Sequence, residues 1–304
     1  MSEILVTGGL GFIGSHLVKE LRIRGYEVWC CDLVHSAEPK SIRCDIREYR
    51  QVKRLFDNHK FDLVYHLAAE YGRWNGEDYY ENLWLTNVIG TKHLIRLQEE
   101  KKFKMVFFSS AEVYGDYHGI MKEEVPETIH VHLLNDYAMS KWVAEMMIRN
   151  SAKQFNTETV IVRPFNVYGP GEHYHPYRGF VIKFIYKALK NEPYTVYLGH
   201  KRTLEYVDDV VKAVANIAEN FKTGSIYNLG GEELYEIKEI SDMVLRYLGK
   251  DDSIVTYRDE EAFTTKVKKP DSSKAKSELG FRTSVRPEEG IPRTIDWFKR
   301  TMAI

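Results

Sequence analysis

The chain has 304 residues, of which 43% are hydrophobic and 29% charged, which is enough for one large domain or for a main domain with a smaller lobe. Its 43 lysines and arginines balance 44 aspartates and glutamates, and the net charge of −1 gives no reason to expect nucleic acid or an anionic membrane as a partner. No run reaches the roughly 18 apolar residues of a membrane span, and no basic targeting segment precedes the first strand. The three cysteines are Cys30, Cys31 and Cys44, and they form no C-x-x-C pair. We therefore expect reduced thiols and a cytoplasmic protein.

The chain opens with a strand, a turn and a helix. An apolar run from Ile4 to Val6 enters a turn in which Gly8, Gly11 and Gly14 have the spacing G-x-x-G-x-x-G, and a helical segment follows from Ser15 to Arg24. Only glycine lets a backbone come so close to a pyrophosphate, and the helix presents unpaired N–H groups and the positive end of its dipole. The pattern predicts a dinucleotide site, although an ordinary tight turn can carry the same glycines.

A second strand, from Glu27 to Cys31, ends in Asp32, which lies 18 residues beyond Gly14. An acidic residue at this distance is typical of the group that meets the adenosine ribose hydroxyls. A carboxylate there repels a 2′-phosphate, so the sequence favours NAD over NADP, and it argues against a reductase that releases its cofactor at each turnover. The alternative for Asp32 is a turn residue without a ligand.

Further strand-like runs alternate with helical segments. They cover Leu63 to Leu67, Lys104 to Ser109 and Thr159 to Arg163. Such alternation implies right-handed βαβ units, and continuous apolar runs such as Met105 to Phe108 indicate strands that are covered on both faces. We therefore expect an α/β protein with a doubly wound parallel sheet of the Rossmann type.

The alternation loosens near Gly169, where a loop rich in proline, glycine, histidine and tyrosine runs to Gly179 and is followed by a helix from Phe180 to Lys190. We predict an NAD-binding domain over 1–168, with a return segment near 203–229, and a smaller substrate-binding lobe over 169–202 and 230–304. Ligands of open parallel sheets bind beyond the carboxyl ends of the strands, so the substrate should lie between the two parts.

Tyr137 and Lys141 stand four residues apart in a predicted helix from Asp136 to Asn150, so both side chains leave the same face. A nearby ammonium favours phenolate over phenol and lowers the tyrosine pKa, which suits the removal of a hydroxyl proton near neutral pH. Ser110 follows the strand that ends at Ser109, and its hydroxyl can hydrogen-bond the same substrate oxygen. Together with a nicotinamide, these residue types indicate hydride transfer from a secondary alcohol.

At this point the chain resembles the extended short-chain dehydrogenase/reductases, specifically the nucleotide-sugar epimerases and dehydratases. The resemblance runs along nearly the whole sequence, and Asn87 matches a structural asparagine of the family. It implies a tightly held NAD that is reduced and reoxidised within one cycle, a nucleotide-diphosphate sugar as substrate, and a 4-keto intermediate. It assigns the cofactor to Gly8, Gly11, Phe12, Ile13, Gly14, Asp32, Asp45, Ile46, Leu67, Ala68, Ala69, Tyr137 and Lys141, and the substrate to Glu70, Ser110, Asn166 and Arg202.

In this family the 4-keto intermediate leads to C4 epimerisation, to 4,6-dehydration or to decarboxylation of a uronic sugar. Dehydratases of the dTDP-glucose type carry Thr-Asp-Glu where this chain has Ser110-Ala111-Glu112, so the acid is lost at Ala111 while Glu112 is kept. Epimerisation requires only Ser110, Tyr137, Lys141 and NAD, and is favoured; dehydration through Glu112 is the alternative. Decarboxylases carry arginines near the C-terminus, where this chain has lysines, which cannot grip a carboxylate bidentately: Lys266, Lys268 and Lys269.

Several of these residues have plainer interpretations. Glu112 can be a solvated turn residue, Arg202 can belong to a surface ion pair, and the lysines between 266 and 274 are typical of an exposed basic face. His173 and His175 invite a metal site, but no further ligand cluster is evident, so we expect no metal and place them with Tyr177 at the mouth of the site. A non-catalytic NAD-sensing protein on the same fold would be expected to lose the tyrosine or the lysine of the pair.

Two predicted helices, Asn82 to Glu100 and Asp136 to Asn150, carry a set of apolar side chains. In the resembling family, two helices from each subunit form a four-helix contact, so we expect a homodimer; packing against the sheet is the alternative. The residues are Trp84, Leu85, Ile89, Trp142, Met146 and Met147.

Overall fold

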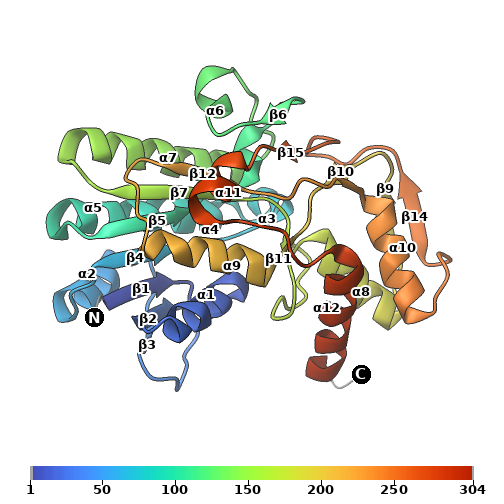
Figure 1. Cartoon of the computed structure of the whole chain (residues 1–304), viewed down its shortest axis with the longest axis horizontal. Coiled ribbons are helices and arrows are strands. Elements are labelled where there is room, and N and C mark those ends of the chain that lie inside the picture. Colours follow the sequence, from blue (N-terminus) through green and yellow to red (C-terminus); the bar gives the residue numbers. More distant parts are fainter. Residues whose placement is uncertain (1–2, 303–304) are drawn as a thin grey trace.

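A parallel sheet of seven strands forms the centre of the protein, in the order β12-β7-β5-β4-β1-β2-β3 (Figure 1). The structure is a computed structural model that describes residues 3–302. All five strands expected from the sequence lie in this sheet, and β3 and β12 extend it at its edges, which confirms the Rossmann type. The strands are β1 (Glu3–Thr7), β2 (Glu27–Asp32), β3 (Ser41–Arg43), β4 (Leu63–His66), β5 (Lys104–Phe108), β7 (Thr159–Pro164) and β12 (Ile226–Leu229).

Helices cover both faces of the sheet, and alternate strand residues point into two separate cores. In β1, Ile4 and Val6 belong to the core on one face, whereas Leu5 belongs to the core on the other. This is why the strands appear in the sequence as continuous apolar runs. The first core is closed by α1 (Phe12–Ile23), α9 (Val207–Ala215) and α11 (Ser273–Leu279), and the second by α2 (Tyr49–Asn58), α5 (Thr91–Lys101) and α7 (Asp136–Phe155).

Helix α7 has a polar cap at each end. The Asn135 side chain accepts a hydrogen bond from the Ala138 N–H at 2.7 Å, which satisfies one of the free donors of the first turn. Asn156 ends the helix in the left-handed conformation with φ 54°. The helix is five residues longer than the sequence pattern predicts, because Ser151 and its neighbours still pack against α5.

The single helix that we expected over 82–100 is interrupted. It is divided into α4 (Tyr80–Trp84), a π-helical turn η1 (Leu85–Gly90) and α5. Asn87 lies inside the π turn, where its amide nitrogen donates to the Glu70 carbonyl at 2.9 Å and to Ser140 Oγ at 3.0 Å. Such turns frequently occur at functional sites, and this one brings α5 and α7 to the carboxyl edge of the sheet.

A third core lies outside the sheet, on the right-hand side of Figure 1. The loop from Gly169 to Gly179 leads into it and contains no helix or strand. The chain then returns to the sheet through α9 and β12, as the sequence suggested. The elements that enclose this core are α8 (Phe180–Lys190), α10 (Ile237–Leu248), α12 (Pro287–Met302) and the parallel pair β9 (Tyr194–Tyr197) and β14 (Val255–Arg258).

One C-terminal segment differs from the expected division. We placed all of 230–304 in the smaller lobe, but Ala275, Leu279 and Phe281 pack into the sheet core beside α1 and α9. The packing of this segment into the sheet core could not be predicted locally, because a short amphipathic helix fits either core equally well.

Short strand pairs and turns connect the sheet with the third core. They bring segments that are far apart in the sequence next to the carboxyl ends of the strands, since β15 lies beside β6 and β11 beside β8. The pairs are β6 (Ile120–Met121) with β15 (Lys269–Pro270), β8 (Val167–Tyr168) with β11 (Glu205–Tyr206) and β10 (Lys201–Arg202) with β13 (Tyr235–Glu236), and the short helices are α3 (Arg73–Asp78), α6 (Val125–Thr128), η2 (Ala111–Tyr114) and η3 (Asn216–Ala218).

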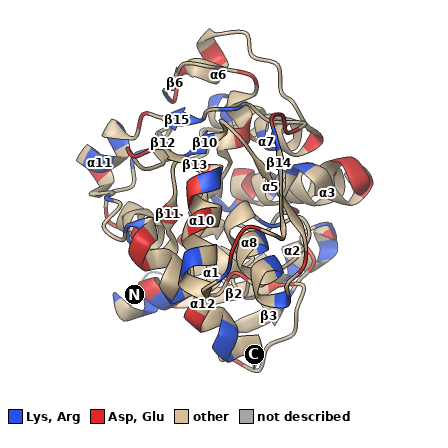
Figure 2. Cartoon of the chain, turned by 90° about the vertical axis from the view of Figure 1, so that its right-hand side faces the viewer, with Lys and Arg blue, Asp and Glu red and all other residues tan. Residues whose placement is uncertain are grey.

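The charge distribution on the surface agrees with the balanced composition, and the cysteines are reduced. Positive and negative residues alternate over the helices in Figure 2 rather than gathering on one side of the view. No helix within residues 3–302 is long and apolar enough to cross a membrane. The three cysteines are buried and form no disulfide.

Candidate active site

The glycine turn packs tightly against the neighbouring strands. The Gly8 N–H donates to the Cys31 carbonyl at 2.8 Å. A Cβ atom on Gly8 would lie 2.8 Å from the Ala68 nitrogen, and one on Gly14 would lie 2.1 Å from the Gly8 carbonyl oxygen. Helix α1 begins at Phe12 with no side-chain cap on its first N–H groups. The turn thus admits no side chain and leaves backbone donors for an anion, which fits the pyrophosphate of a dinucleotide.

Asp32 ends β2 beside this turn and is held in place by backbone. Its Oδ2 accepts from the Leu10 N–H at 3.1 Å, and its Oδ1 accepts from the Leu33 N–H at 2.8 Å. A hollow of about 550 Å³ opens beside the glycine turn and extends along α1. It is lined by Gly9, Leu10, Ser15, Val18, Lys19, Arg22, Ile23, Cys30 and Glu38.

A buried histidine connects the ends of the strands β1 and β4, next to the expected cofactor site. His66 ends β4, and its Nδ1 and Nε2 lie 2.7 Å from Thr7 Oγ1 and 3.0 Å from Thr91 Oγ1. Burial lowers the pKa of His66 to about 3, so the ring is neutral and serves as a structural link. The Ala68 N–H donates to Thr7 Oγ1 at 3.1 Å, which sets the expected cofactor segment Leu67 to Ala69 against β1.

Ser110, Tyr137 and Lys141 come together beyond the carboxyl end of β5. The Ser110 side chain lies close enough to Tyr137 to oppose the rise of its pKa. Lys141 is 4% exposed, its ammonium donates to the Phe108 carbonyl at 2.8 Å, and it lies 5.9 Å from the centre of the Tyr137 ring. The sequence prediction that these three side chains share one site therefore agrees with the geometry.

The charge state of this trio corrects one expectation. Burial raises the pKa of Tyr137 to about 12, although Ser110 opposes this rise. The lowered tyrosine pKa that we expected from the nearby Lys141 is therefore not found in the protein without its ligands. Burial also lowers the pKa of Lys141 to about 7, against the pull of Glu145. The physical reason is desolvation: both charged forms lose water, and the ammonium is bonded to a carbonyl rather than to the phenol.

Glu112 and Lys268 form an ion pair next to the trio, with 2.5 Å between Oε1 and Nζ; the lysine side chain is 4% exposed and the glutamate side chain 21%. Burial opposes ionisation of Glu112, but the charges of Lys268 and Arg73 outweigh it and lower the pKa of Glu112 to about 2. Burial lowers the pKa of Lys268 to about 8. Glu112 is therefore not a solvated turn residue. Lys268, at 4% exposed, is not part of an exposed basic face either, although Lys266 is exposed.

Arg202 is buried rather than placed in a surface ion pair. Its guanidinium donates to the carbonyls of Lys201, Thr265 and Lys266 at 2.7–2.8 Å and to Thr264 Oγ1 at 3.1 Å. Burial lowers the pKa of Arg202 to about 10. The segment 264–266 is thus held across the site by Arg202, next to the Glu112–Lys268 pair.

Asn166 lies directly before the neighbouring strand β8. Its side-chain nitrogen donates to the Thr203 carbonyl at 2.9 Å, and its backbone N–H donates to Glu205 Oε2 at 2.5 Å. Glu205 is fully buried, and burial raises its pKa to about 7. Asn166 thus bonds to the segment that follows Arg202, although Arg202 itself lies on β10, which pairs with β13. The shared diphosphate site stays a prediction.

Glu70 is saturated by other side chains. Its Oε1 accepts from Asn82 Nδ2 at 2.7 Å and its Oε2 from Asn75 Nδ2 at 2.9 Å. Asn82 in turn accepts from Arg47, whose guanidinium holds Asp45 with 2.7 Å between Nη2 and Oδ2. A continuous polar chain therefore connects the expected adenine residue Asp45 with the expected substrate residue Glu70.

A family model described as the NAD dependent epimerase/dehydratase family matches residues 4–230. The chain belongs to this family. Two curated proteins are similar to it along nearly its whole length. It is 31% identical to the UDP-N-acetyl-alpha-D-glucosaminuronate decarboxylase of Bacillus cytotoxicus over 97% of both chains. It is 30% identical to the dTDP-D-glucose 4,6-dehydratase of Bos taurus, over 98% of this chain and 88% of that protein.

Solved structures give the same result for the epimerase/dehydratase fold. The UDP-glucose 4-epimerase of Thermus thermophilus in complex with NAD superimposes with a TM-score of 0.87 and 28% identity, over 98% of this chain and 99% of that one. The expectations of an extended short-chain dehydrogenase/reductase, of an enzyme and of NAD as its cofactor are therefore confirmed at the level of the epimerase/dehydratase family. The comparisons do not determine which nucleotide sugar this enzyme uses or which reaction it catalyses.

The site of this epimerase/dehydratase also contains residues that the sequence did not single out. Lys268 comes from a segment whose other lysines are exposed, so no sequence signal separates it. Arg178 lies flat on the Tyr71 ring at 3.7 Å, and its Nε has no hydrogen-bond partner among the described residues. Its place at the end of the expected mouth loop was the only available signal.

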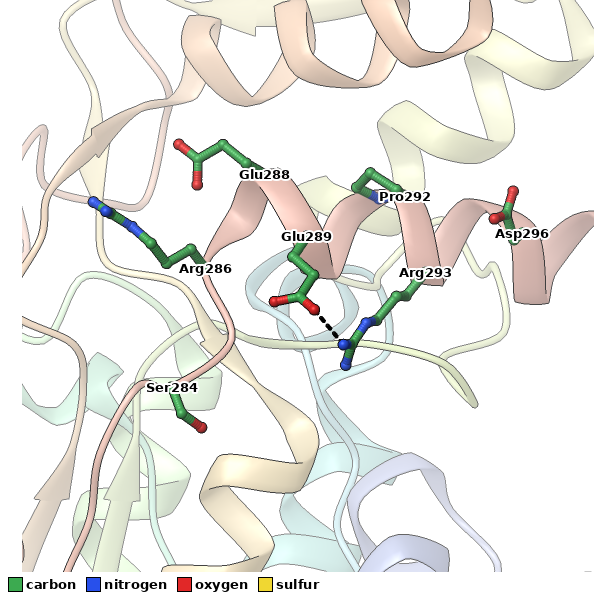
Figure 3. Close-up of a pocket in the computed structure, with 7 residues that line it drawn as sticks. All are labelled: Ser284, Arg286, Glu288, Glu289, Pro292, Arg293 and Asp296. Carbon is green, nitrogen blue, oxygen red and sulfur yellow. Dashed lines mark hydrogen bonds and ion pairs between the residues drawn. The ribbon is translucent and has the colours of Figure 1, made fainter.

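His175 and Tyr177 of the mouth loop contact aromatic and acidic side chains. Within residues 3–302 no group of three histidine, cysteine, aspartate or glutamate side chains could hold a metal ion. His175 contacts the Tyr177 and Tyr71 rings, and Tyr177 donates to Asp78 at 2.6 Å. A second hollow of about 740 Å³ lies along α12 and contains none of the catalytic candidates (Figure 3). Its lining residues are Ser284, Arg286, Glu288, Glu289, Pro292, Arg293 and Asp296.

Proposed function

We propose that this enzyme inverts C4 of a nucleotide-diphosphate hexose through a transient 4-keto sugar. The observation that carries the proposal is the meeting of Ser110, Tyr137 and Lys141 beyond the carboxyl end of β5, on the sheet edge that also bears the glycine turn. These groups suffice for reversible alcohol oxidation, and no additional acid or base is needed for inversion.

In this mechanism Tyr137 Oη takes the proton of the C4 hydroxyl and later returns it. NAD held at the turn of Gly8, Gly11 and Gly14 would supply the reversible hydride acceptor for C4. Ser110 Oγ, which lies next to Tyr137, steers the substrate oxygen to the phenol. The ammonium of Lys141 stabilises the phenolate, which burial alone disfavours, so its protonated form is required when the proton moves.

The ion pair at Glu112 weighs against 4,6-dehydration. That reaction needs a base for the C5 proton and an acid for the leaving C6 hydroxyl. A carboxylate whose pKa is lowered to about 2 by Lys268 and its neighbours, against burial, is a weak base and holds no proton to donate. Ala111 cannot supply either group. Glu112 is then a binding residue for the sugar in the epimerase.

Decarboxylation of a uronic sugar is the second candidate. It is favoured by the 31% identical decarboxylase and by the cations Lys268, Arg202 and Arg178 around the expected sugar position. Lys268, which stands near the place of the arginines of decarboxylases, weighs against it, because lysine cannot grip a carboxylate bidentately. Since C4 oxidation is common to both reactions, the same trio serves either.

For the substrate we propose the roles predicted from the sequence, adjusted to the observed bonds. Arg202 would attract the diphosphate by its charge, since its N–H groups hold the segment 264–266. Asn166 would contribute from the adjacent strand. Glu70 would shape the wall of the site through Asn75 and Asn82 rather than bind sugar directly.

We also propose a homodimer through the helices next to the site. Leu85, Ile89 and Met146 are 49%, 44% and 45% exposed, and Met139 on α7 is 39% exposed, so a set of apolar side chains faces outward from two adjacent elements. Trp142 and Met147, in contrast, pack partly against the cores of their own chain. The expected set of six is therefore only partly available to a partner.

Proton NMR of the purified enzyme with UDP-, dTDP-, GDP- and CDP-hexoses and hexuronates, without added cofactor, tests the proposal. A new anomeric signal with an otherwise intact sugar is the expected result. A C6 methyl doublet would instead establish dehydration, and loss of the C6 carboxylate to give a pentose would establish decarboxylation. No change with any sugar in protein that retains NAD would overturn the proposed function.

A further inference from the structure

A buried carboxylate that the proposed mechanism does not use lies directly behind the catalytic trio. Glu145 is 0% exposed and continues the four-residue spacing of Tyr137 and Lys141 on the same face of α7. Each of its oxygens accepts two hydrogen bonds. Oε1 accepts from Ser109 Oγ at 2.5 Å and Arg163 Nε at 2.9 Å, and Oε2 accepts from Arg163 Nη2 at 2.6 Å and Arg149 Nη2 at 2.8 Å.

The bonds of Glu145 connect the elements that carry the reacting groups. Ser109 is the residue before Ser110, so the carboxylate ties the end of β5 to the helix of Tyr137 and Lys141. Arg163, also 0% exposed, donates to the Tyr114 hydroxyl at 3.1 Å, at the end of the turn that holds Glu112. Tyr114 in turn donates to Asn228 Oδ1 at 2.6 Å on β12.

The electrostatic surroundings of Lys141 depend on the same carboxylate. Around the ammonium, α7 contributes Glu145 and Tyr137, β4 contributes the neutral His66, and β7 contributes Arg163, which is compensated by Glu145. No carboxylate lies within ion-pair distance of Lys141 in the part of the chain that the structure describes. Burial lowers the pKa of Lys141 to about 7, and Glu145 is the group that opposes this shift.

Stability does not explain the pair. Replacing a fully buried ion pair by apolar side chains of similar volume is often neutral or stabilising, so the desolvation of Glu145 and Arg163 points to a role beyond holding the fold. We propose that Glu145, fixed by Arg163, is a positioning residue of the reaction: its charge keeps the Lys141 ammonium in place, and its bond to Ser109 sets Ser110 against Tyr137. The inference rests on the proposed function of the trio.

The test compares Glu145→Gln with Ser109→Ala, using Glu99→Gln as a matched control. Glu99 also accepts a serine hydroxyl, Ser151 Oγ at 2.9 Å, but lies on α5. If Glu145 is neutral, the pKa of Lys141 falls further, so the protonated lysine that the reaction requires is lost at a lower pH and the basic limb of kcat moves to lower pH. We expect a shift of about one pH unit, equal to about a tenfold loss near neutral pH that is regained at lower pH, with KM nearly unchanged.

Ser109→Ala keeps the charge and should lower kcat without moving the pH profile, whereas Glu99→Gln should leave both unchanged. A folded Glu145→Gln protein with the wild-type pH profile overturns the inference. If this variant does not fold, the decision falls on Ser109→Ala, and an unchanged kcat there overturns the positioning role.

A second measurement separates this inference from the proposed function. The NMR chemical shift of the Lys141 side chain with pH, assigned by comparison with a Lys141→Met counterpart, follows ionisation of Lys141 without any substrate. A downward shift of this midpoint in Glu145→Gln supports the inference even if no nucleotide sugar is turned over. An unshifted midpoint overturns it whatever the reaction proves to be.

Discussion

The two ends of the active-site cleft expected in this enzyme are built in different ways. The dinucleotide end is formed by one continuous segment, from β1 through the glycine turn into α1, and its ligand groups are mainly backbone N–H. The reaction end combines the end of β5, η2, α7, β10 and the segment before β15, and its groups are side chains with opposed charges. The dinucleotide end depends on the absence of side chains, whereas the reaction end depends on which partner each charged side chain has.

This difference has an energetic side. At the glycine turn the constraint is steric, because a Cβ on Gly14 would reach the Gly8 carbonyl. At the reaction end the constraint is electrostatic, because Lys141, Glu112 and Lys268 are all removed from water and each depends on a neighbour for its charge state. Substitutions at the two ends should therefore fail in different ways.

The largest effect is expected at the reaction end. Tyr137→Phe removes the acid–base hydroxyl and should lower kcat by about 10²–10⁴-fold, the usual contribution of such a group, while NAD stays bound. Steady-state turnover and the absorbance of protein-bound NAD after purification check both statements. If the variant keeps wild-type turnover, Tyr137 is not the base. Loss of NAD as well would remove the contrast between the two ends.

The opposite pattern is expected for Gly14→Ala. The added Cβ would meet backbone at 2.1 Å, so the turn must shift, at a cost of about 3 kcal/mol in the free energy of unfolding and with loss of bound NAD. Gly25→Ala is the control: its φ of 86° is strained for alanine, but nothing lies within 4 Å of the new Cβ. Thermal unfolding and NAD content distinguish the two. Equal NAD retention would show that the close approach at Gly14 is not needed.

A double-mutant cycle at Glu112 and Lys268 sharpens the comparison at the reaction end. Lys268→Met leaves a partly buried carboxylate without its partner and should cost about 2 kcal/mol of unfolding free energy. The combined Glu112→Gln and Lys268→Met protein should recover part of this loss, because no uncompensated charge remains. Denaturant unfolding measures the coupling. Additive losses would show that the two groups do not interact in solution.

The smallest effect concerns pH and the mouth of the site. Burial raises the pKa of Glu172 to about 7, against the opposing charge of Arg178. A raised folded-state pKa means that the contribution of this group is complete below its unfolded value and is lost as pH rises through about 7. Glu172→Gln should therefore destabilise the protein more at about pH 5 than at about pH 8, where it should lower the melting temperature less or raise it. The difference between the two pH values should be about 1 kcal/mol in the free energy of unfolding.

The control for Glu172→Gln is the exposed Glu260. Glu260→Gln should change the melting temperature equally at both pH values, because a solvated carboxyl gains no pH-dependent term from folding. A parallel response of the two variants would contradict the buried state of Glu172.

The sequence predicted most at the dinucleotide end. Gly8, Gly11, Gly14 and Asp32 could be assigned because they lie close together in the chain, and the strands beside them have unbroken apolar patterns. The helix over 82–100 was predicted as regular, since nothing local announces the π turn: it depends on the bonds that Asn87 makes to Glu70 and Ser140.

At the reaction end the sequence predicted which residue types meet, but not their charges. The four-residue spacing of Tyr137 and Lys141 placed them on one face of α7, yet the expected lowering of the tyrosine pKa was reversed by burial. Lys268 was assigned to an exposed basic face because lysine is usually solvated. Its burial against Glu112 could not be foreseen, since the two residues are 156 positions apart.

The sequence by itself therefore determined the alternation of strands and helices, the glycine turn and the candidates for the catalytic trio, because these follow from local spacing and from the two periodicities of helix and strand. The tertiary structure decided the protonation of Tyr137, Lys141 and Glu112, and the pairing of Lys268, because desolvation and Coulomb attraction depend on which distant segments close over a group.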